Sequence, residues 1–343
     1  MGCAAALIAC GGAPSADDGG ALPGQDAAAR DGGALADSGG GADGAAPDSG
    51  ADSGPAPTQL VFVIPLENKA QTQIYGNMSD APYINGTLMP AYAHTTAFGD
   101  ALPALMSEPH YVWMESGTNV FQDHTFATDN DSSSSNSTSS TEHLVTQLKA
   151  AGVSWMAYQE GIAASSCPIK STGFYAAKHD PFVFFQDVAG NPPSSSNAYC
   201  ASHHKPLSAL AADLQSQAVA RYNFITPDVC HDMHGDNACP QANTNAANIK
   251  AGDDWLKANL PPIITYALAH DGVVFLTWDE GDASNLIPFI AIGKWVKKGY
   301  ASKVKVDHSS LLKTEEEIFG VPALAKVQAA ADLSDLFEPG HFP

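Results

Sequence analysis

The stretch that decides the fold is Leu60-Val-Phe-Val-Ile-Pro-Leu-Glu67-Asn68, an apolar run that stops on a carboxylate and an amide. Six of its first seven residues are apolar, and several are β-branched. This composition is typical of a strand covered on both faces, as in the parallel sheet of an α/β domain. Because an acid is costly to bury without a partner, Glu67 and Asn68 must find one where the strand ends.

A second stretch repeats this design far away in the sequence. Gly272-Val-Val-Phe-Leu-Thr-Trp278 is followed by Asp279-Glu280-Gly281. In open parallel sheets, ligands collect at the carboxyl ends of the strands. Two strands that deliver acids to one edge therefore predict a cation site there.

The rest of the chain alternates between strand and helix patterns, which predicts an α/β fold with a mostly parallel central sheet flanked by helices. Strands are expected at residues 153–158, 223–228 and 288–293, and helices at residues 81–92, 141–152, 207–214, 253–256, 261–269 and 307–319. Residues 161–205 show no regular pattern and are expected to be irregular.

Composition limits the classes of function. The chain has 343 residues, 44% of them apolar, which suffices for one large α/β domain or two smaller ones. Its formal net charge of −21 argues against a nucleic-acid binder and against an anionic-membrane binder that relies on broad positive charge. No apolar run approaches the roughly 20 residues that span a bilayer.

The N-terminal region predicts export. Residues 1–10 resemble a signal remnant in which Leu7-Ile8-Ala9-Cys10 matches a bacterial lipobox, so a lipid anchor on Cys10 is the expected link to a membrane. Residues 11–57 are a Gly/Ala/Asp/Ser linker that lacks the apolar surface to fold. Residues 58–343 are expected to form the folded domain of a cell-envelope lipoprotein or secreted protein.

Four cysteines lie in this domain. An even number in an exported chain favours two disulfides, with Cys230–Cys239 closing a short loop and Cys167–Cys200 a longer one. The sequence leaves the pairing open. None of the four has CxxC spacing, which argues against a thiolate zinc cluster.

Ser107 opens the segment Ser107-Glu-Pro109-His110-Tyr111. A serine just before a helix-starting proline is ordinarily an N-cap. A hydroxyl at a helix N-terminus is also where free N–H groups stabilise developing anionic charge, as a phosphoryl acceptor needs. The two interpretations are compatible.

Further polar residues follow strands or open helices, and together they predict one site on one sheet edge. Each alone has an ordinary interpretation as a solvated turn, a helix cap or a disulfide-pinned loop. Their oxygen-rich composition with a few histidines suits a divalent cation and leaves zinc, calcium, magnesium and manganese open. The residues are Glu67, Asn68, Ser107, His231, Asp232, His234, Asp279, Glu280 and His308.

A collinear series of blocks over about residues 59 to 323 resembles the phosphoesterase family, the bacterial and fungal acid phosphatases and phospholipases C of the alkaline phosphatase superfamily. The blocks are Glu67-Asn68-Lys69, Ala81-Pro82-Tyr83-Ile84-Asn85, Ser107-x-Pro109-x-Tyr111 with Ser116-Gly117, Lys178-His179-x-Pro181-Phe182, Phe224-Ile-Thr-Pro-Asp228 through Asp232-Met-His234, Gly252-Asp253-x-Trp255-Leu, Thr277-Trp-Asp279-Glu280, and His308-x-Ser-Leu-Leu with Phe319-Gly320.

The resemblance implies an alkaline-phosphatase-like three-layer sandwich and a metal-dependent hydrolase of phosphate esters, with residues 58–343 as its catalytic domain. Ser107 matches the nucleophile that forms a phosphoenzyme. Glu67, Asn68, Asp279 and Glu280 match the metal-site blocks, with Ser107 as a further ligand. The metal would depress the pKa of the hydroxyl.

The resemblance also implies roles for the histidines. His234 with Asp232, and His231 or His179 beside them, would bind metal or phosphate or protonate the leaving group. His308 belongs to the same substrate-binding set. The resemblance does not divide these roles among the residues. The implied partner is a phosphate-ester small molecule or a phospholipid headgroup, and the oligomeric state is open.

The chain departs from the family pattern beside the expected nucleophile. His110 stands where the family usually has an asparagine that contacts the phosphoryl group, and Leu105-Met106 replaces a typical His-Pro. An imidazole still offers an N–H donor. If His110 donates as a cation, we expect activity to fall as it deprotonates, and a flat profile from pH 5 to 8 would count against that role.

Three alternatives stay open. A sulfatase of the same superfamily would need Cys/Ser-x-Pro-x-Arg, and Tyr111 replaces the arginine, so formylglycine formation is not expected. A catalytically impaired surface lipoprotein would bind a ligand on the same fold. A phospholipase C-type phosphodiesterase would share the site; because the chain ends soon after the core, the compact acid-phosphatase type is favoured.

Overall fold

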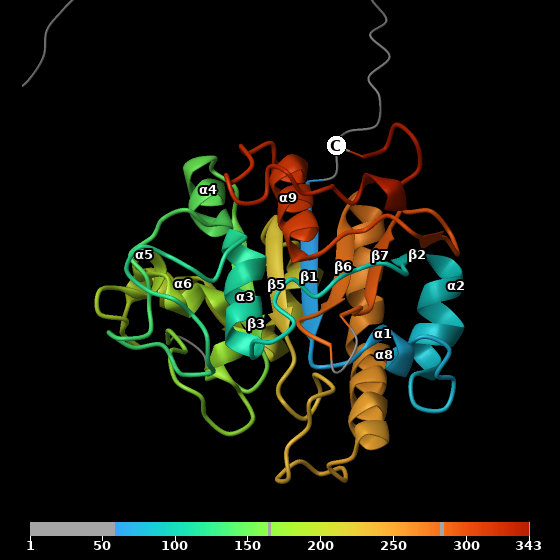
Figure 1. The fold of residues 1–343 in the computed structure, drawn as a ribbon, viewed down its shortest axis with the longest axis horizontal. Helices are drawn as coiled ribbons and strands as arrows, with labels where there is room; N and C mark the ends of the chain where they lie inside the picture. Colours follow the sequence, from blue (N-terminus) through green and yellow to red (C-terminus); the bar gives the residue numbers. More distant parts are fainter. Residues whose placement is uncertain (1–58, 164–165, 282–284, 343) are drawn as a thin grey trace, which may run out of the picture. The chain divides into compact units, whose positions relative to one another are not determined.

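An eight-stranded sheet organises the part of the chain described by the structure, a computed structural model in which residues 59–163, 166–281 and 285–342 are placed (Figure 1). The expected lipobox at residues 1–10, the lipid anchor on Cys10 and the linker at residues 11–57 lie outside the described residues. Among the described helices, none combines the length and apolarity that a membrane span requires.

The sheet has the strand order β4-β3-β5-β1-β6-β7-β2-β8, and the apolar run that begins at Leu60 forms β1 near its centre. The strands are β1 (Val61–Leu66), β2 (Ala93–Thr95), β3 (Trp155–Gln159), β4 (His204–Pro206), β5 (Tyr222–Thr226), β6 (Val273–Trp278), β7 (Phe289–Gly293) and β8 (Ala301–Ser302).

Strand β1 pairs in parallel with both of its neighbours in the sheet, β5 and β6. Val61 is opposite Tyr222 of β5 and opposite Val273 of β6, so β1, β5 and β6 end at the same edge. Every residue of β1 and β6 is buried, as the apolar runs predicted. The sheet is mostly parallel, and β7 is its antiparallel exception because it runs against both β6 and β2.

Helices cover both faces of the sheet, and Figure 1 shows α3 and α9 in front of the strands with α8 behind β6 and β7. Helix α3 packs on α9, and α7 packs on α8. The α-helices are α1 (Gln71–Ile74), α2 (Met89–Ala91), α3 (Ser107–Ser116), α4 (Leu144–Ala150), α5 (Gln186–Ala189), α6 (Ala198–Ser202), α7 (Leu210–Ser216), α8 (Asn245–Ala269) and α9 (His308–Phe319).

Five short helical turns complete the described elements. One π-helical turn, η1 (Ile84–Leu88), precedes α2, and four 3₁₀ turns are η2 (Ala177–His179), η3 (Pro181–Phe184), η4 (Leu207–Ala209) and η5 (Ser334–Leu336). The expected α/β fold with a mostly parallel central sheet flanked by helices is therefore confirmed.

Two sequence predictions about regular structure were wrong in detail. The expected irregular region 161–205 contains η2, η3, α5, α6 and part of the edge strand β4. The two helices expected at residues 253–256 and 261–269 form the single helix α8, which continues through Pro261 and Pro262.

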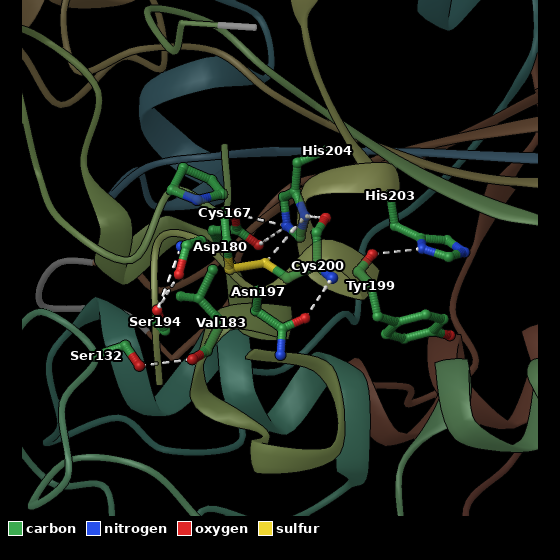
Figure 2. The surroundings of a disulfide bond; sticks show 12 residues. Ser132, Cys167, Asp180, Val183, Ser194, Asn197, Tyr199, Cys200, His203 and His204 are labelled. Carbon is green, nitrogen blue, oxygen red and sulfur yellow. Dashed lines mark hydrogen bonds and ion pairs between the residues drawn. A yellow bond between two sulfur atoms is a disulfide. The ribbon is translucent and has the colours of Figure 1, made fainter. Parts of the chain in front are cut away.

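The favoured disulfides are confirmed. Cys167 bonds to Cys200 and Cys230 to Cys239, with Cα atoms 5.1 and 5.5 Å apart. Figure 2 shows that the first disulfide lies beside His204, whose Nδ1 is 2.7 Å from the Cys200 carbonyl oxygen. His204 Nε2 lies 3.1 Å from Asp180 Oδ2. Asp180 directly follows His179, so this disulfide supports the segment that carries a predicted site residue.

Candidate active site

The ends of β1 and β6 bring their acids together at one edge of the sheet. The Asn68 N–H donates to Asp279 Oδ1 over 3.0 Å, and the Asp279 N–H donates to the Leu66 carbonyl over 2.9 Å. Asn68 adopts a left-handed backbone conformation, with φ at 48°, which is uncommon for a residue other than glycine. The chain accepts this conformation where β1 turns from the core into the site.

Ser107 is the first residue of α3, and its hydroxyl points at these acids. The helix N-cap is Met106, which makes no side-chain cap bond, so the N-cap interpretation of Ser107 was wrong. Ser107 Oγ donates to Glu67 Oε2 over 3.0 Å and lies 3.3 Å from Glu280 Oε1. The hydroxyl is therefore held by the site rather than by its own helix.

A second group of ligand atoms gathers around Glu67. Atoms of Glu67, His179 and Asp232 lie within 4.8 Å of one another, and all three residues are buried. His179 Nε2 is 3.3 Å from Glu67 Oε2, and His179 Nδ1 is 3.5 Å from Asp232 Oδ2. Glu67 Oε1, His179 Nε2 and Asp232 Oδ2 have no hydrogen-bond partner. Buried polar atoms without partners are costly, and a cation would satisfy all of them.

The Asn68 side chain also fits a cation. One terminal amide atom lies 3.2 Å from both Asp279 Oδ1 and Glu67 Oε2. If that atom is nitrogen, it donates to both carboxylates. If it is oxygen, three acceptors face one another, which becomes favourable when a cation lies among them. Carboxylates, an amide and an imidazole are a donor set that divalent cations accept in proteins.

Burial and mutual repulsion raise the pKa values of three of these acids, whereas neighbouring cationic groups lower the pKa of Glu67. Burial raises the pKa of Asp279 and of Asp232 well above its usual range, and the charge of Glu67 adds to the rise in both. Burial also raises the pKa of Glu280 to about 7. Burial works in the same direction on Glu67, but His179 and Lys178 outweigh it and hold the Glu67 pKa below its usual value. Without a cation, the site therefore cannot hold all its acids ionised at neutral pH.

His110 and His308 lie together on one flank of the site, with ring centroids 6.5 Å apart. His110 Nε2 is 2.9 Å from Asp100 Oδ1, and its Nδ1 is 2.7 Å from the Met106 carbonyl oxygen. Both ring nitrogens thus have a hydrogen-bond partner in this structure.

His308 donates from Nε2 to the Trp278 carbonyl oxygen over 2.8 Å, whereas its buried Nδ1 has no partner. Burial and the charge of His110 lower the pKa of His308 to about 4. His308 is therefore a neutral imidazole with an acceptor nitrogen beside the last residue of β6.

The loop after β5 separates its two histidines. The backbone N–H of His234 donates to Asp232 Oδ1 over 2.7 Å, and the ring Nδ1 of His234 is 2.7 Å from the Gly235 carbonyl oxygen. His231 Nδ1 lies 3.1 Å from both Glu160 and Asp228. Its bonds to Asp228 and Glu160 raise the pKa of His231 to about 10, so it is the cation of a separate cluster.

Three residues near Ser107 received no role from sequence reasoning. Lys178 Nζ lies 3.5 Å from Ser107 Oγ and 2.6 Å from Asp129 Oδ2. The Tyr111 ring stacks on His179 with centroids 5.0 Å apart. Lys178 and Tyr111 stand inside the sequence blocks that resemble the family, whereas Asp129 lies just before the Ser/Asn-rich residues 130–141 and shows no periodic signal.

The block Gly252-Asp253-x-Trp255-Leu has a structural role. Asp253 of α8 accepts the backbone N–H groups of Tyr83 and Ile84, each over 2.9 Å. Two blocks that are 170 residues apart thereby meet, and Asp253 anchors the start of η1.

Two solved structures share the fold of this chain. A protein of the alkaline phosphatase superfamily from Vibrio parahaemolyticus matches with a TM-score of 0.50 and 12% identity over 79% of this chain and 69% of that chain. Murine ectonucleotide pyrophosphatase/phosphodiesterase 5, an inactive variant in complex with AMP, matches with a TM-score of 0.53 and 10% identity over 82% and 100%. The fold is that of the alkaline phosphatase superfamily.

Sequence comparison narrows the class to a family. The model of the Phosphoesterase family matches residues 103–322, more than half of the chain. A phosphatidylinositol-3-phosphatase of Mycobacterium tuberculosis is 28% identical over 86% of this chain and 88% of its own length. A phosphate-repressible acid phosphatase of Penicillium chrysogenum is 25% identical over 53% and 43%. The chain belongs to the Phosphoesterase family and is a hydrolase that acts on phosphoric esters.

Proposed function

We propose that the chain is a metal-dependent phosphomonoesterase of the acid-phosphatase type and that Ser107 is its nucleophile. The observation that carries the proposal is the Ser107 hydroxyl, which donates to Glu67 over 3.0 Å at the start of a helix and among buried acids with unpartnered oxygens. A helix N-terminus favours the negative charge that a phosphoryl group brings.

In the proposed reaction, Ser107 Oγ attacks phosphorus while the bond from phosphorus to the leaving oxygen breaks. The hydroxyl proton leaves along the hydrogen bond to Glu67 or along the contact to Glu280. His234, whose side chain is exposed next to the buried Asp232, supplies a proton to the leaving oxygen. Water then attacks the phosphoserine, the bond from phosphorus to Oγ breaks, and inorganic phosphate leaves.

Glu67, Asn68, Asp279 and Glu280, with the Ser107 oxygen, would hold the divalent cation, and the cluster geometry adds His179 and Asp232 as candidate ligands. When bound, the cation would neutralise phosphoryl oxygens and lower the pKa of the Ser107 hydroxyl. His231 would serve elsewhere, because its Nδ1 lies 3.1 Å from both Glu160 and Asp228 in a separate cluster.

A phosphate monoester is the proposed substrate, either a small molecule or a phospholipid headgroup. The names of the Mycobacterium tuberculosis and Penicillium chrysogenum relatives, both phosphatases, support a monoester. The first relative, named for a phosphoinositide, supports a headgroup. A phospholipase C-type diesterase is the competing outcome, and hydrolysis of bis(p-nitrophenyl) phosphate in preference to the monoester would reveal it.

We further propose that the protein is exported. Two disulfides support this location, because disulfides form and persist in oxidising compartments. Incorporation of labelled palmitate into the full chain, and its loss in Cys10→Ala, would test the anchor.

The deciding experiment is turnover of p-nitrophenyl phosphate with and without EDTA. Ser107→Ala is expected to lose activity by at least a thousandfold, since the nucleophile is gone. Ser116→Ala is the matched control, because it makes the same change at the other end of α3, where the hydroxyl bonds only to backbone carbonyls. Turnover that survives both EDTA and Ser107→Ala would overturn the proposal. No turnover of any phosphoester would favour an impaired, ligand-binding protein.

A further inference from the structure

Lys178 is the cation nearest to the Ser107 hydroxyl among the described contacts. Its Nζ lies 3.5 Å from Ser107 Oγ, and the side chain is 21% exposed, so a substrate can reach it. Its charge also lowers the pKa of Glu67, which places the ammonium group in the electrostatic field of the acids. Neither Glu67 and Asn68 at the end of β1 nor Asp279 and Glu280 at the end of β6 supply a positive charge for a phosphate.

Asp129 holds this ammonium group and the nucleophile helix together. Its Oδ2 accepts from Lys178 Nζ over 2.6 Å, and its Oδ1 accepts from the backbone N–H of Glu108 over 3.0 Å. Glu108 is the residue after Ser107, and its own carboxylate accepts the Asn130 N–H over 2.7 Å. The loop at Asp129 and the start of α3 are therefore joined from both sides.

We propose that Lys178 is a phosphoryl-binding catalytic residue and that Asp129 is its positioning partner, which competes with substrate for the ammonium group. The inference rests on the proposed role of Ser107. A phosphorus atom bonded to Ser107 Oγ carries non-bridging oxygens that extend beyond Oγ, and an ammonium group 3.5 Å from Oγ is within reach of a charge-assisted bond of about 2.8 Å to one of them.

The competing interpretation is an ordinary ion pair that only braces the loop. The two interpretations differ in the sign of one effect. If Lys178 binds phosphate, removal of its charge weakens phosphate binding, whereas removal of the Asp129 charge strengthens it because the competing anion is gone. If the pair only braces the loop, both changes act in the same direction, since each breaks the same contact.

The test measures binding of inorganic phosphate by calorimetry to the metal-loaded enzyme and its variants, together with kcat/KM for p-nitrophenyl phosphate. Lys178→Met is expected to weaken phosphate binding about tenfold to a hundredfold, which is the range for loss of a bond to a charged group. Asp129→Asn keeps an oxygen for the Glu108 N–H and is expected to tighten binding severalfold. Lys178→Arg should retain most of the affinity.

Lys170→Met is the matched control. Lys170 is 58% exposed and lies 4.0 Å from Asp131, so the same substitution should leave phosphate binding unchanged. Equal changes of phosphate affinity in Lys178→Met and Asp129→Asn, or no change in either, would overturn the inference. If Lys178→Met does not fold, weaker or unchanged phosphate binding in Asp129→Asn overturns it alone.

Failure of this inference is distinguishable from failure of the proposed function. If Ser107→Ala abolishes turnover while Lys178→Met keeps both phosphate affinity and kcat/KM, only the inference is wrong. If Ser107→Ala retains turnover, the proposed function is wrong whatever the phosphate affinities are.

Discussion

Glu280→Gln should stabilise the metal-free protein at high pH and should reduce the stability that the protein gains from a bound metal. Glu280 is half-buried, and burial together with the charge of Glu67 raises its pKa from an ordinary value of 4.5 to about 7, although His110 opposes the rise. A raised pKa in the folded state means that the carboxylate costs stability when it is ionised. The wild-type protein therefore loses stability as pH rises from about 4.5 through 7.

The size of the effect follows from the pKa values. A rise from 4.5 to about 7 corresponds to about 3 kcal/mol, and screening of a half-buried group reduces this to about 1.5 kcal/mol. In EDTA at pH 8, Glu280→Gln should then be more stable than wild type by about 1.5 kcal/mol, or about 2–3 °C in Tm for a domain of this size. At pH 4 the two proteins should be equally stable.

Divalent cation should reverse this order. Wild type gains stability by mass action, about 2.7 kcal/mol at a hundredfold excess over Kd, whereas the variant lacks a carboxylate ligand and gains less. Thermal unfolding followed by circular dichroism at both pH values, with EDTA and with each candidate metal, measures all of these terms. Glu142→Gln, an exposed residue, is the control. A less stable Glu280→Gln in EDTA at pH 8, or an equal gain from metal, would refute the reasoning.

Three further predictions concern the frame of the site. Asp253→Asn should cost about 1–3 kcal/mol in urea unfolding, because two backbone N–H groups lose a charged acceptor; the neighbouring exposed Asp254→Asn should change little, and equal losses would contradict the assignment. Replacing both Cys167 and Cys200 with alanine should lower the free energy of unfolding by about 3–4 kcal/mol, and replacing both Cys230 and Cys239 by about 2–3 kcal/mol. The first disulfide should contribute more because it closes a loop of 33 residues, whereas the second closes a loop of 9. A larger loss for the second pair in urea unfolding would count against this chain-entropy argument. The pKa of His110 is raised because its bonds to Asp100 outweigh the opposing effect of burial, so the pair stabilises the fold below pH 6.5, and that stability is lost as pH rises through the raised pKa. Asp100→Asn should therefore be less stable than wild type near pH 5–6 and approach the stability of wild type at high pH. A stability difference that stays constant across the pH range would exclude this linkage.

Much of the site was predictable because long apolar strands carry a clear signal. The acids after β1 and β6 were expected at one edge, and the parallel register of the two strands places them there. Ser107 was correctly placed at the start of a helix, although Met106 occupies the N-cap position. The helix α8 was divided in the prediction because Pro261 and Pro262 normally end a helix.

The rest of the site could not be predicted, because it depends on tertiary contacts that leave no periodic pattern in the sequence. Residues 161–205 form elements of three to five residues, which are too short to show a period, yet η2 delivers Lys178 and His179 to the site. The resemblance left open whether His231 or His179 lies beside Asp232 and His234, and the turn after β5 places His231 Nδ1 3.1 Å from Glu160. The engagement of both His110 nitrogens follows from the loop that carries Asp100, and no local pattern encodes it.

Mass spectrometry of the enzyme quenched in acid during turnover of p-nitrophenyl phosphate tests most directly whether Ser107 is the nucleophile. We expect a phosphoryl group on the peptide that contains Ser107, present with a divalent cation and absent after EDTA treatment or in Ser107→Ala. Turnover in which Ser107 remains unmodified while a phosphoryl group accumulates on another side chain, or turnover undiminished in EDTA, would contradict a metal-assisted Ser107 nucleophile.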